Sequence, residues 1–267
     1  MKVMLPSRLL LKMAASGVAL GVLAGCSSSP ATAPSSSAAR ADSLAGTIVV
    51  DAAASLTEAF GAIAQQFETA HPGVTITLNF SGSSALAQSI VAGAPVDVFA
   101  AASPSTMATV TDARLAETPR AFASNSLEIA VPPGNPGKVT SLTDFADTSR
   151  TIALCAAEVP CGAAAATVFA AAGVTPSPDT LEEDVKAALT KVRLGEVDAA
   201  LVYRTDVKAA GKEVDGIEFP ESSTAVTHYP ISALKGSKSP EVASAFVAFV
   251  LGDSAQKVLK DAGFATG

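Results

Sequence analysis

Patterns typical of strands and of helices alternate along most of the chain. Residues 47–51 (TIVVD) form a short apolar run, and a stretch with apolar residues at helical spacing follows it to about residue 70. Residues 74–80 alternate β-branched and polar side chains, and residues 96–101 (VDVFAA) are almost continuously apolar. The first pattern is typical of a half-buried strand and the second of a strand in a parallel sheet. This alternation predicts an α/β protein.

A second series of such units follows a loop rich in proline and glycine at residues 132–138. We predict strands at 125–131, 151–154 and 198–203, helices at 161–172 and 182–193, and a short helix ending at residue 210. Residues 225–233 are extended and carry the chain back, and 240–251 and 254–262 read as closing helices. The order predicts two lobes, each a mostly parallel sheet flanked by helices, joined by a hinge with a ligand cleft between them.

The N-terminus has the organisation of a bacterial export signal. Basic residues accompany an apolar core at residues 9–23, which is short for a membrane span. Residues 23–26 (LAGC) resemble the lipobox of bacterial lipoproteins, with Cys26 as the lipidated residue. Residues 27–42, rich in Ser, Ala and Pro, read as a flexible tether. We expect a body outside the cytoplasmic membrane, anchored by the lipid on Cys26; an uncleaved anchor would give the same location.

These signals divide the chain into four parts. Residues 1–25 form the signal peptide and 26–45 the tether with its lipidated cysteine. One lobe comprises 46–127 and 229–267, and the other comprises 128–228.

The charge of the chain argues against a nucleic-acid partner. The 25 acidic residues outnumber the 18 basic ones, three of which (Lys2, Arg8 and Lys12) lie in the signal peptide, so the mature chain carries a formal charge of −10. Such a surface repels polyanions. An anionic ligand must therefore be held by oriented donors at short range.

Two serines occupy predicted helix starts, where backbone N–H groups lack partners and the helix dipole favours anions. Ser83 lies in the run SGSS at residues 81–84, between a predicted strand and a helix, and Ser55 follows the first strand. The run predicts an oxyanion cradle; an ordinary serine cap is the alternative. Ser55 and Glu58 also have the Ser-x-x-Glu spacing of a capping box, which is compatible with a ligand at the backbone N–H.

Cysteines and histidines argue for structural rather than catalytic roles. With Cys26 lipidated, Cys155 and Cys161 remain as a pair in an oxidising location, and their spacing matches neither a zinc knuckle nor a Cys-x-x-Cys motif. We expect a structural disulfide rather than free thiols. His71 and His228 are too isolated for a catalytic base or a metal site, so we expect no cation site.

Several motifs, taken in order, resemble those of the extracytoplasmic molybdate-binding proteins of ABC importers. The motifs are AAASLT at 52–57, FSGSSALA at 80–87, GAPVDVF at 93–99, VPCG at 159–162, DVKAAL at 184–189 and LVY at 201–203. The resemblance covers residues 47–263. It implies a type II periplasmic-binding-protein fold, a tetrahedral oxyanion as ligand, no enzymatic activity and no cofactor.

The resemblance also implies a ligand set. Ser55 and Ser83 would donate hydroxyl and N–H groups, Cys161 and Val185 backbone N–H groups, and Tyr203 its phenol. Relatives commonly have Ala where this chain has Cys161, which a backbone donor tolerates. Core packing is the alternative role for Val185, and a buried phenol with a protein partner is the alternative for Tyr203.

The predicted function is capture of molybdate, and of tungstate, by a monomeric lipoprotein receptor that delivers it to a membrane permease. A receptor for sulfate or phosphate is the alternative, although a protonated phosphate needs an acceptor that this ligand set lacks. A secreted hydrolase using Ser83 is a more distant alternative, because the chain lacks a Gly-x-Ser-x-Gly elbow there. For Arg204, next to Tyr203, we expect a surface role, with tuning of the site as the alternative, and Glu158 is the acid nearest in sequence to a residue of the ligand set.

Overall fold

The computed structural model describes residues 44–116 and 118–266. The predicted signal peptide, Cys26 and all but the end of the tether lie outside these residues. The tether was predicted to reach residue 45, whereas the first strand already begins at Ala45. Among the helices described, none is by itself long and apolar enough to cross a membrane. Helices α7 (Pro240–Val250) and α8 (Asp253–Ala262) reach that length and composition only together, with a 57° bend between them.

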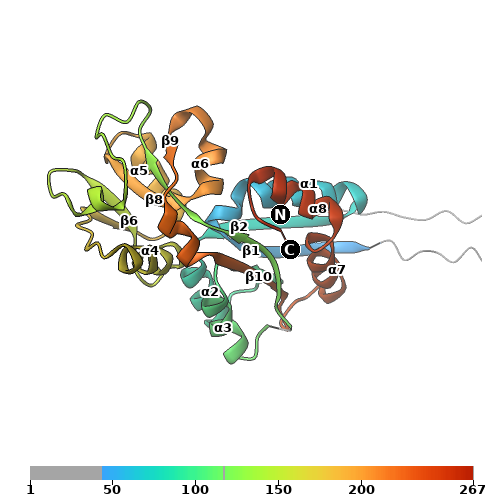
Figure 1. Ribbon diagram of the computed structural model, residues 1–267. Helices are drawn as coiled ribbons and strands as arrows, with labels where there is room; N and C mark the ends of the chain where they lie inside the picture. The colour runs from blue at the N-terminus through green and yellow to red at the C-terminus, as the bar shows by residue number, and fades with distance from the viewer. Residues whose placement is uncertain (1–43, 117, 267) are drawn as a thin grey trace, which may run out of the picture. The chain divides into compact units, whose positions relative to one another are not determined.

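The first sheet has five strands in the order β2-β1-β3-β10-β4 (Figure 1). Its strands are β1 (Ala45–Ala53), β2 (Gly73–Ser81), β3 (Val98–Ala100), β4 (Arg120–Asn125) and β10 (Thr227–Ala233). The first three pair in parallel, and β10 lies antiparallel between β3 and β4. Its helices are α1 (Thr57–Ala70), α2 (Ser83–Val91), α3 (Pro104–Asp112), α7 (Pro240–Val250) and α8 (Asp253–Ala262), with a 3₁₀ turn η1 (Ala54–Leu56) before α1. We call this part the first half.

The second sheet also has five strands, in the order β7-β6-β8-β5-β9 (Figure 1). Its strands are β5 (Leu127–Val131), β6 (Ile152–Cys155), β7 (Thr180–Glu182), β8 (Ala199–Tyr203) and β9 (Asp215–Ile217). Strand β6 pairs in parallel with β7 and β8, and β5 pairs antiparallel with β8 and β9. Its helices are α4 (Pro160–Ala172), α5 (Val185–Arg193) and α6 (Arg204–Ala210), with 3₁₀ turns η2 (Leu142–Ala146), η3 (Gly211–Glu213) and η4 (Pro220–Ala225). We call this part the second half.

The chain passes between the halves twice, through single residues. Ser126 separates β4 from β5, and Val226 separates η4 from β10. The two passages are neighbours because Asn125 pairs with Thr227 across the β4–β10 ladder. Two adjacent, short connections of this kind suit a hinge.

Each half has a core of its own. In the first half Phe67 packs edge-on against Phe246, with ring centroids 5.4 Å apart, and Phe246 also meets Phe60. In the second half Phe145 packs against Phe169 beside the buried strands β6 and β8. The predicted fold class is therefore confirmed: two sheets, each flanked by helices and built on its own core.

Three local predictions were wrong. The predicted strand at 125–131 is the end of β4 and all of β5, because the chain changes sheets at Ser126. Glu182 ends strand β7 instead of starting a helix, and α5 begins at Val185. The Ser55–Glu58 capping box does not form, since Ser55 sits in the 3₁₀ turn η1 with its hydroxyl turned to Tyr229.

Candidate functional site

A small cavity gathers all five residues of the predicted ligand set. It is lined by both halves: Ala53, Ala54, Ser55, Ser81, Gly82, Ser83 and Ala102 from the first, and Val159, Pro160, Cys161, Asp184, Val185 and Tyr203 from the second. The five predicted residues are each at most 4% exposed. Strand ends and helix starts of both sheets thus converge on one enclosed space, the arrangement expected of a ligand site in α/β folds.

Ser83 presents a hydroxyl proton to this cavity. It is the first residue of α2, and the N-cap, Gly82, has no side chain to cap the helix. The Ser83 hydroxyl oxygen accepts a hydrogen bond from the backbone N–H of Ala102, 3.0 Å away. A backbone N–H can only donate, so the serine keeps its own proton for another acceptor.

Ser55 has a comparable arrangement with a side-chain partner. Its hydroxyl oxygen lies 2.9 Å from the phenolic oxygen of Tyr229, a fully buried residue of β10. The hydroxyl is therefore not used to cap α1, whose N-cap, Leu56, has no side-chain hydrogen bond.

Helix α5 directs one backbone donor at the cavity because of how it is capped. The N-cap, Asp184, accepts hydrogen bonds from the N–H groups of Lys186 and Ala187 at 2.8 and 2.9 Å. These are the second and third N–H groups of the helix, so the cap leaves the first, that of Val185, unpaired. Asp184 is the one carboxylate among the cavity-lining residues described, and sequence reasoning did not include it.

Helix α4 presents Cys161 in a similar way. Pro160 is its first residue and has no N–H, so Cys161 carries the first free donor of the helix. Cys161 is joined to Cys155 by a disulfide, which closes the loop between β6 and α4. The crosslink fixes the helix start that faces the cavity.

The phenol of Tyr203 reaches the cavity from the end of β8. Its hydroxyl is buried and has no hydrogen-bond partner among the described protein atoms. Burial raises the pKa of this hydroxyl far above its usual value, so it stays protonated and can only act as a neutral group. A buried hydroxyl without a partner is costly, and this one is able to donate to an acceptor in the cavity.

Behind Tyr203 lies a charged group that the sequence did not reveal. Asp206 is fully buried, accepts the backbone N–H of Tyr203 at 3.2 Å, and pairs with Lys186 at 3.1 Å. Lys186 also pairs with Glu58 of α1 at 2.8 Å, so the group joins the two halves. Burial raises the pKa of Asp206 to about 6, although Lys186 opposes that shift. A second link between the halves is the hydrogen bond from the Ser84 hydroxyl to the Glu158 carbonyl, 2.6 Å long.

No lysine, arginine or histidine is among the cavity-lining residues that the structure describes. The Glu158 side chain is exposed and lies outside the cavity, as does Arg204. In the described ranges no three His, Cys, Asp or Glu residues form a cluster that could hold a metal ion.

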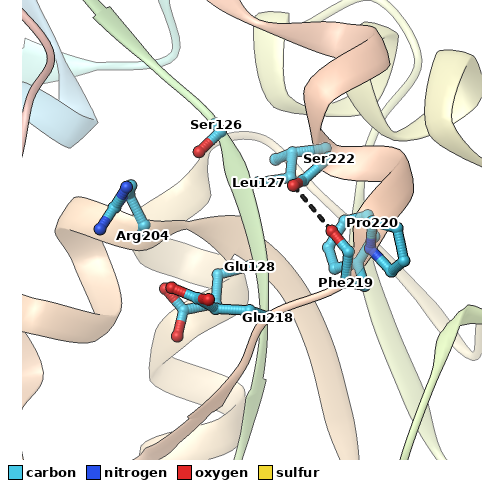
Figure 2. A pocket seen from close by; sticks show the side chains of 8 residues that line it. All are labelled: Ser126, Leu127, Glu128, Arg204, Glu218, Phe219, Pro220 and Ser222. Atoms are coloured by element: carbon cyan, nitrogen blue, oxygen red, sulfur yellow. Dashed lines mark hydrogen bonds between the residues drawn. The ribbon is translucent and has the colours of Figure 1, made fainter.

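A larger pocket of about 420 Å³ lies elsewhere, beside the passage at Ser126. Figure 2 shows the carboxylates of Glu128 and Glu218 in the same part of this pocket. Burial and the neighbouring Glu218 raise the pKa of Glu128. This pocket places Arg204 beside the two carboxylates, whereas the smaller cavity gathers the predicted donors, so the smaller cavity is the candidate anion site.

The fold and the cavity together define a class of protein. Two α/β halves, linked by two adjacent passages, enclose neutral donors contributed by both sides. This is the architecture of a two-lobed solute-binding protein with a small anionic ligand.

The chain belongs to the family of bacterial extracellular solute-binding proteins, which it matches over residues 48–265. It is 38% identical over 246 residues to the molybdate-binding protein ModA of Mycobacterium tuberculosis, covering 92% of this chain and 93% of that protein. The sequence-based resemblance to molybdate-binding proteins is thereby confirmed.

Solved structures agree on the fold. The periplasmic molybdate-binding protein of Azotobacter vinelandii superimposes with a TM-score of 0.72 at 20% identity, covering 82% of this chain and 99% of that one. The sulfate-binding protein SubI of Mycobacterium tuberculosis gives 0.71 at 17% identity, covering 82% of this chain and 86% of that one. At these identities the likeness shows the fold alone, so the choice of anion depends on the site.

Proposed function

We propose that this protein is an extracytoplasmic, non-enzymatic receptor that binds molybdate, and tungstate, and delivers it to an ABC permease. The observation that carries the proposal is the buried phenol of Tyr203, which lacks a partner among the described protein atoms and faces a cavity whose described hydrogen-bond donors are all neutral, Asp184 being an acceptor. The 38% identity to a protein named for molybdate binding supports the choice of ligand.

The donors suit an anion that only accepts hydrogen bonds. Molybdate and tungstate are fully deprotonated at neutral pH, so every ligand oxygen can receive the hydroxyl and N–H groups of the site. Hydrogen phosphate also carries a proton, which needs an acceptor. Asp184 is the one carboxylate among the described lining residues, and its Oδ1 accepts two N–H groups of α5, so a phosphate proton would have to reach its Oδ2. Sulfate is smaller, and its shorter bonds would leave some donors out of reach.

Hinge closure is the proposed mechanism. Ser55 and Ser83 belong to the first half, and Cys161, Val185 and Tyr203 to the second. An anion would first bind to the donors of one half. The donors of the other half would then reach it as the chain bends at Ser126 and Val226. Closure removes water and replaces it with charge-assisted hydrogen bonds, each of which contributes about 1.5–3 kcal/mol.

The hydrolase alternative lacks support from the site. Ser83 would need a general base, and no histidine lies among the described cavity-lining residues. The hydroxyl oxygen of Ser83 accepts from a backbone N–H, which cannot take up its proton.

Calorimetric titration with molybdate, tungstate, sulfate and phosphate at pH 7 tests the proposal. We expect molybdate and tungstate to bind alike and phosphate at least about tenfold more weakly. Ser55→Ala and Ser83→Ala should each cost about 1.5–3 kcal/mol of molybdate binding without changing the fold. Unchanged affinity in both variants would contradict the site, and displacement of molybdate by equal phosphate would contradict the ligand.

The lipid anchor on Cys26 and the monomeric state are part of the same proposal. Mass spectrometry of the membrane-extracted protein would detect a diacylglyceryl group on an N-terminal Cys26. An N-terminus upstream of Cys26 would contradict the anchor.

A further inference from the structure

The two serines of the site differ in what holds their hydroxyl groups. Ser83 accepts from a main-chain N–H, so its proton must point elsewhere. Ser55 lies against the Tyr229 phenol, where either oxygen is able to donate. If Ser55 donated to Tyr229, it would have no proton for an anion. The direction of this one hydrogen bond therefore decides whether Ser55 contributes.

The surroundings of Tyr229 favour one direction. The backbone N–H of Ser126 donates to the Asn125 side-chain oxygen at 3.0 Å, and this donor cannot be reversed. The Asn125 amide nitrogen must then face the other way. It donates to the Thr205 hydroxyl at 2.8 Å and lies 3.5 Å from the Tyr229 oxygen.

Which atom donates in each of the remaining hydrogen bonds follows from the orientation of the Asn125 amide. The Asn125 nitrogen approaches the Tyr229 oxygen as a donor, which leaves the phenol proton for another acceptor. Of the hydroxyls beside it, that of Ser55 lies at hydrogen-bond distance, 2.9 Å, and that of Tyr203 has no hydrogen-bond partner among the described atoms, so donation to Ser55 is favoured. The Ser55 oxygen is then an acceptor, and its own proton is directed to the cavity. Asn125, Tyr229 and Ser55 are each at most 4% exposed, so water does not compete along the path.

We infer that Tyr229 is a positioning residue, which orients the Ser55 hydroxyl as a donor to the ligand through a relay that begins at the hinge. The relay is Ser126 N–H to Asn125, Asn125 to Tyr229, and Tyr229 to Ser55. Because Ser126 is one of the two passages between the halves, the same residues that allow bending also set a ligand donor. The inference rests on the proposed function, since it assigns a role to one donor of that site.

Tyr229→Phe tests the relay by removing one oxygen. The ring keeps its packing against Phe122 and Phe264, whose centroids lie 6.2 and 5.4 Å away. Without the phenol, Ser55 is no longer held as a donor, and we expect calorimetry to show about threefold to tenfold weaker molybdate binding.

Two double variants separate positioning from a general loss of structure. In a Ser55→Ala background, Tyr229→Phe should have no further effect, because the hydroxyl that it orients is absent. In a Ser83→Ala background, its effect should persist in full, because Ser83 is held by the main chain. The comparison of Ser83→Ala with Ser83→Ala/Tyr229→Phe is the matched control.

The outcomes are distinguishable. Unchanged affinity in both Ser55→Ala and Ser83→Ala would mean that the proposed ligand site is wrong, whereas unchanged affinity in Ser55→Ala with a loss in Ser83→Ala would overturn the relay alone. A clear loss in Ser55→Ala, together with an equal effect of Tyr229→Phe in both backgrounds, would overturn the relay while leaving the site intact. The relay is supported if the effects of Tyr229→Phe and Ser55→Ala on the binding free energy are not additive, while those of Tyr229→Phe and Ser83→Ala are additive.

Discussion

Replacing Gly82 with alanine should prevent the halves from closing on a ligand while leaving each half folded. Gly82 precedes α2 with φ −57° and ψ 128°, a conformation that any L-residue adopts without strain. A Cβ placed there would come closer than 3.0 Å to the carbonyl oxygen of Glu183 in the second half. The obstacle is therefore the opposite half and not the local backbone.

The size of the effect on ligand binding follows from the distance by which the two halves must move apart. The Glu183 oxygen is a main-chain atom, so it cannot swing away, and it must retreat by about 1 Å to reach an ordinary separation. Glu183 lies two residues before Val185, so the donors on the second half retreat with it. Losing two hydrogen bonds to a charged ligand, at about 1.5 kcal/mol each, weakens binding by about a hundredfold.

Calorimetry with molybdate and thermal unfolding without ligand together measure this prediction. Gly61→Ala is the matched control, because Gly61 is exposed on α1 and a Cβ there meets nothing within 4 Å. In the absence of ligand, Gly61→Ala should unfold at or above the wild-type temperature, and Gly82→Ala slightly below it, because alanine is a poorer N-cap than glycine. Affinity of Gly82→Ala within about threefold of Gly61→Ala would refute the close approach of the halves in the bound state.

Three further predictions concern the buried groups around the site. Tyr203→Phe should weaken molybdate binding by about tenfold yet leave the ligand-free melting temperature equal or higher, because a buried unpaired hydroxyl is removed; a lower melting temperature would contradict this. Thiol titration of the denatured, unreduced mature protein should find no free thiol at Cys155 or Cys161, and two free thiols would contradict the disulfide. Burial raises the pKa of Asp206 to about 6, so the folded chain keeps a proton that the unfolded chain loses. The free energy of unfolding should therefore fall as the pH rises from about 4 to 6, and Asp206→Asn should flatten that slope relative to wild type; an equal slope would exclude Asp206.

Sequence patterns predicted most of the architecture because apolar periodicity reports burial directly. The strands around residues 47–51 and 198–203 and the helix at 240–251 lie within a few residues of β1, β8 and α7. A change from one sheet to the other within an extended run leaves no such periodicity in the sequence. Residues 125–131 are extended throughout, and only the pairing partners show that Ser126 divides them.

The sequence brought together the five residues of the proposed ligand set, which the structure places around one cavity, but it did not reveal the residues that support them. Ser55 and Ser83 stand at recognisable helix starts, whereas Tyr229 is 174 positions from Ser55 and lies in an apolar strand. Asp184 carried a signal that was missed: an aspartate before an apolar helical run is a strong N-cap. The prediction of a Ser55–Glu58 capping box was wrong because both side chains make tertiary contacts instead: Ser55 contacts Tyr229, and Glu58 pairs with Lys186.

The donors proposed from Cys161 and Val185 belong to the main chain, and this bears on how the receptor can change over generations. Any residue except proline offers the same N–H group, so the two positions are free to drift in side chain as long as the helix starts hold their place. Such drift would hide the site from a comparison of side chains while its chemistry persisted. Asp184, which fixes the start of α5 through its own side chain, would then be the better marker of a shared ligand.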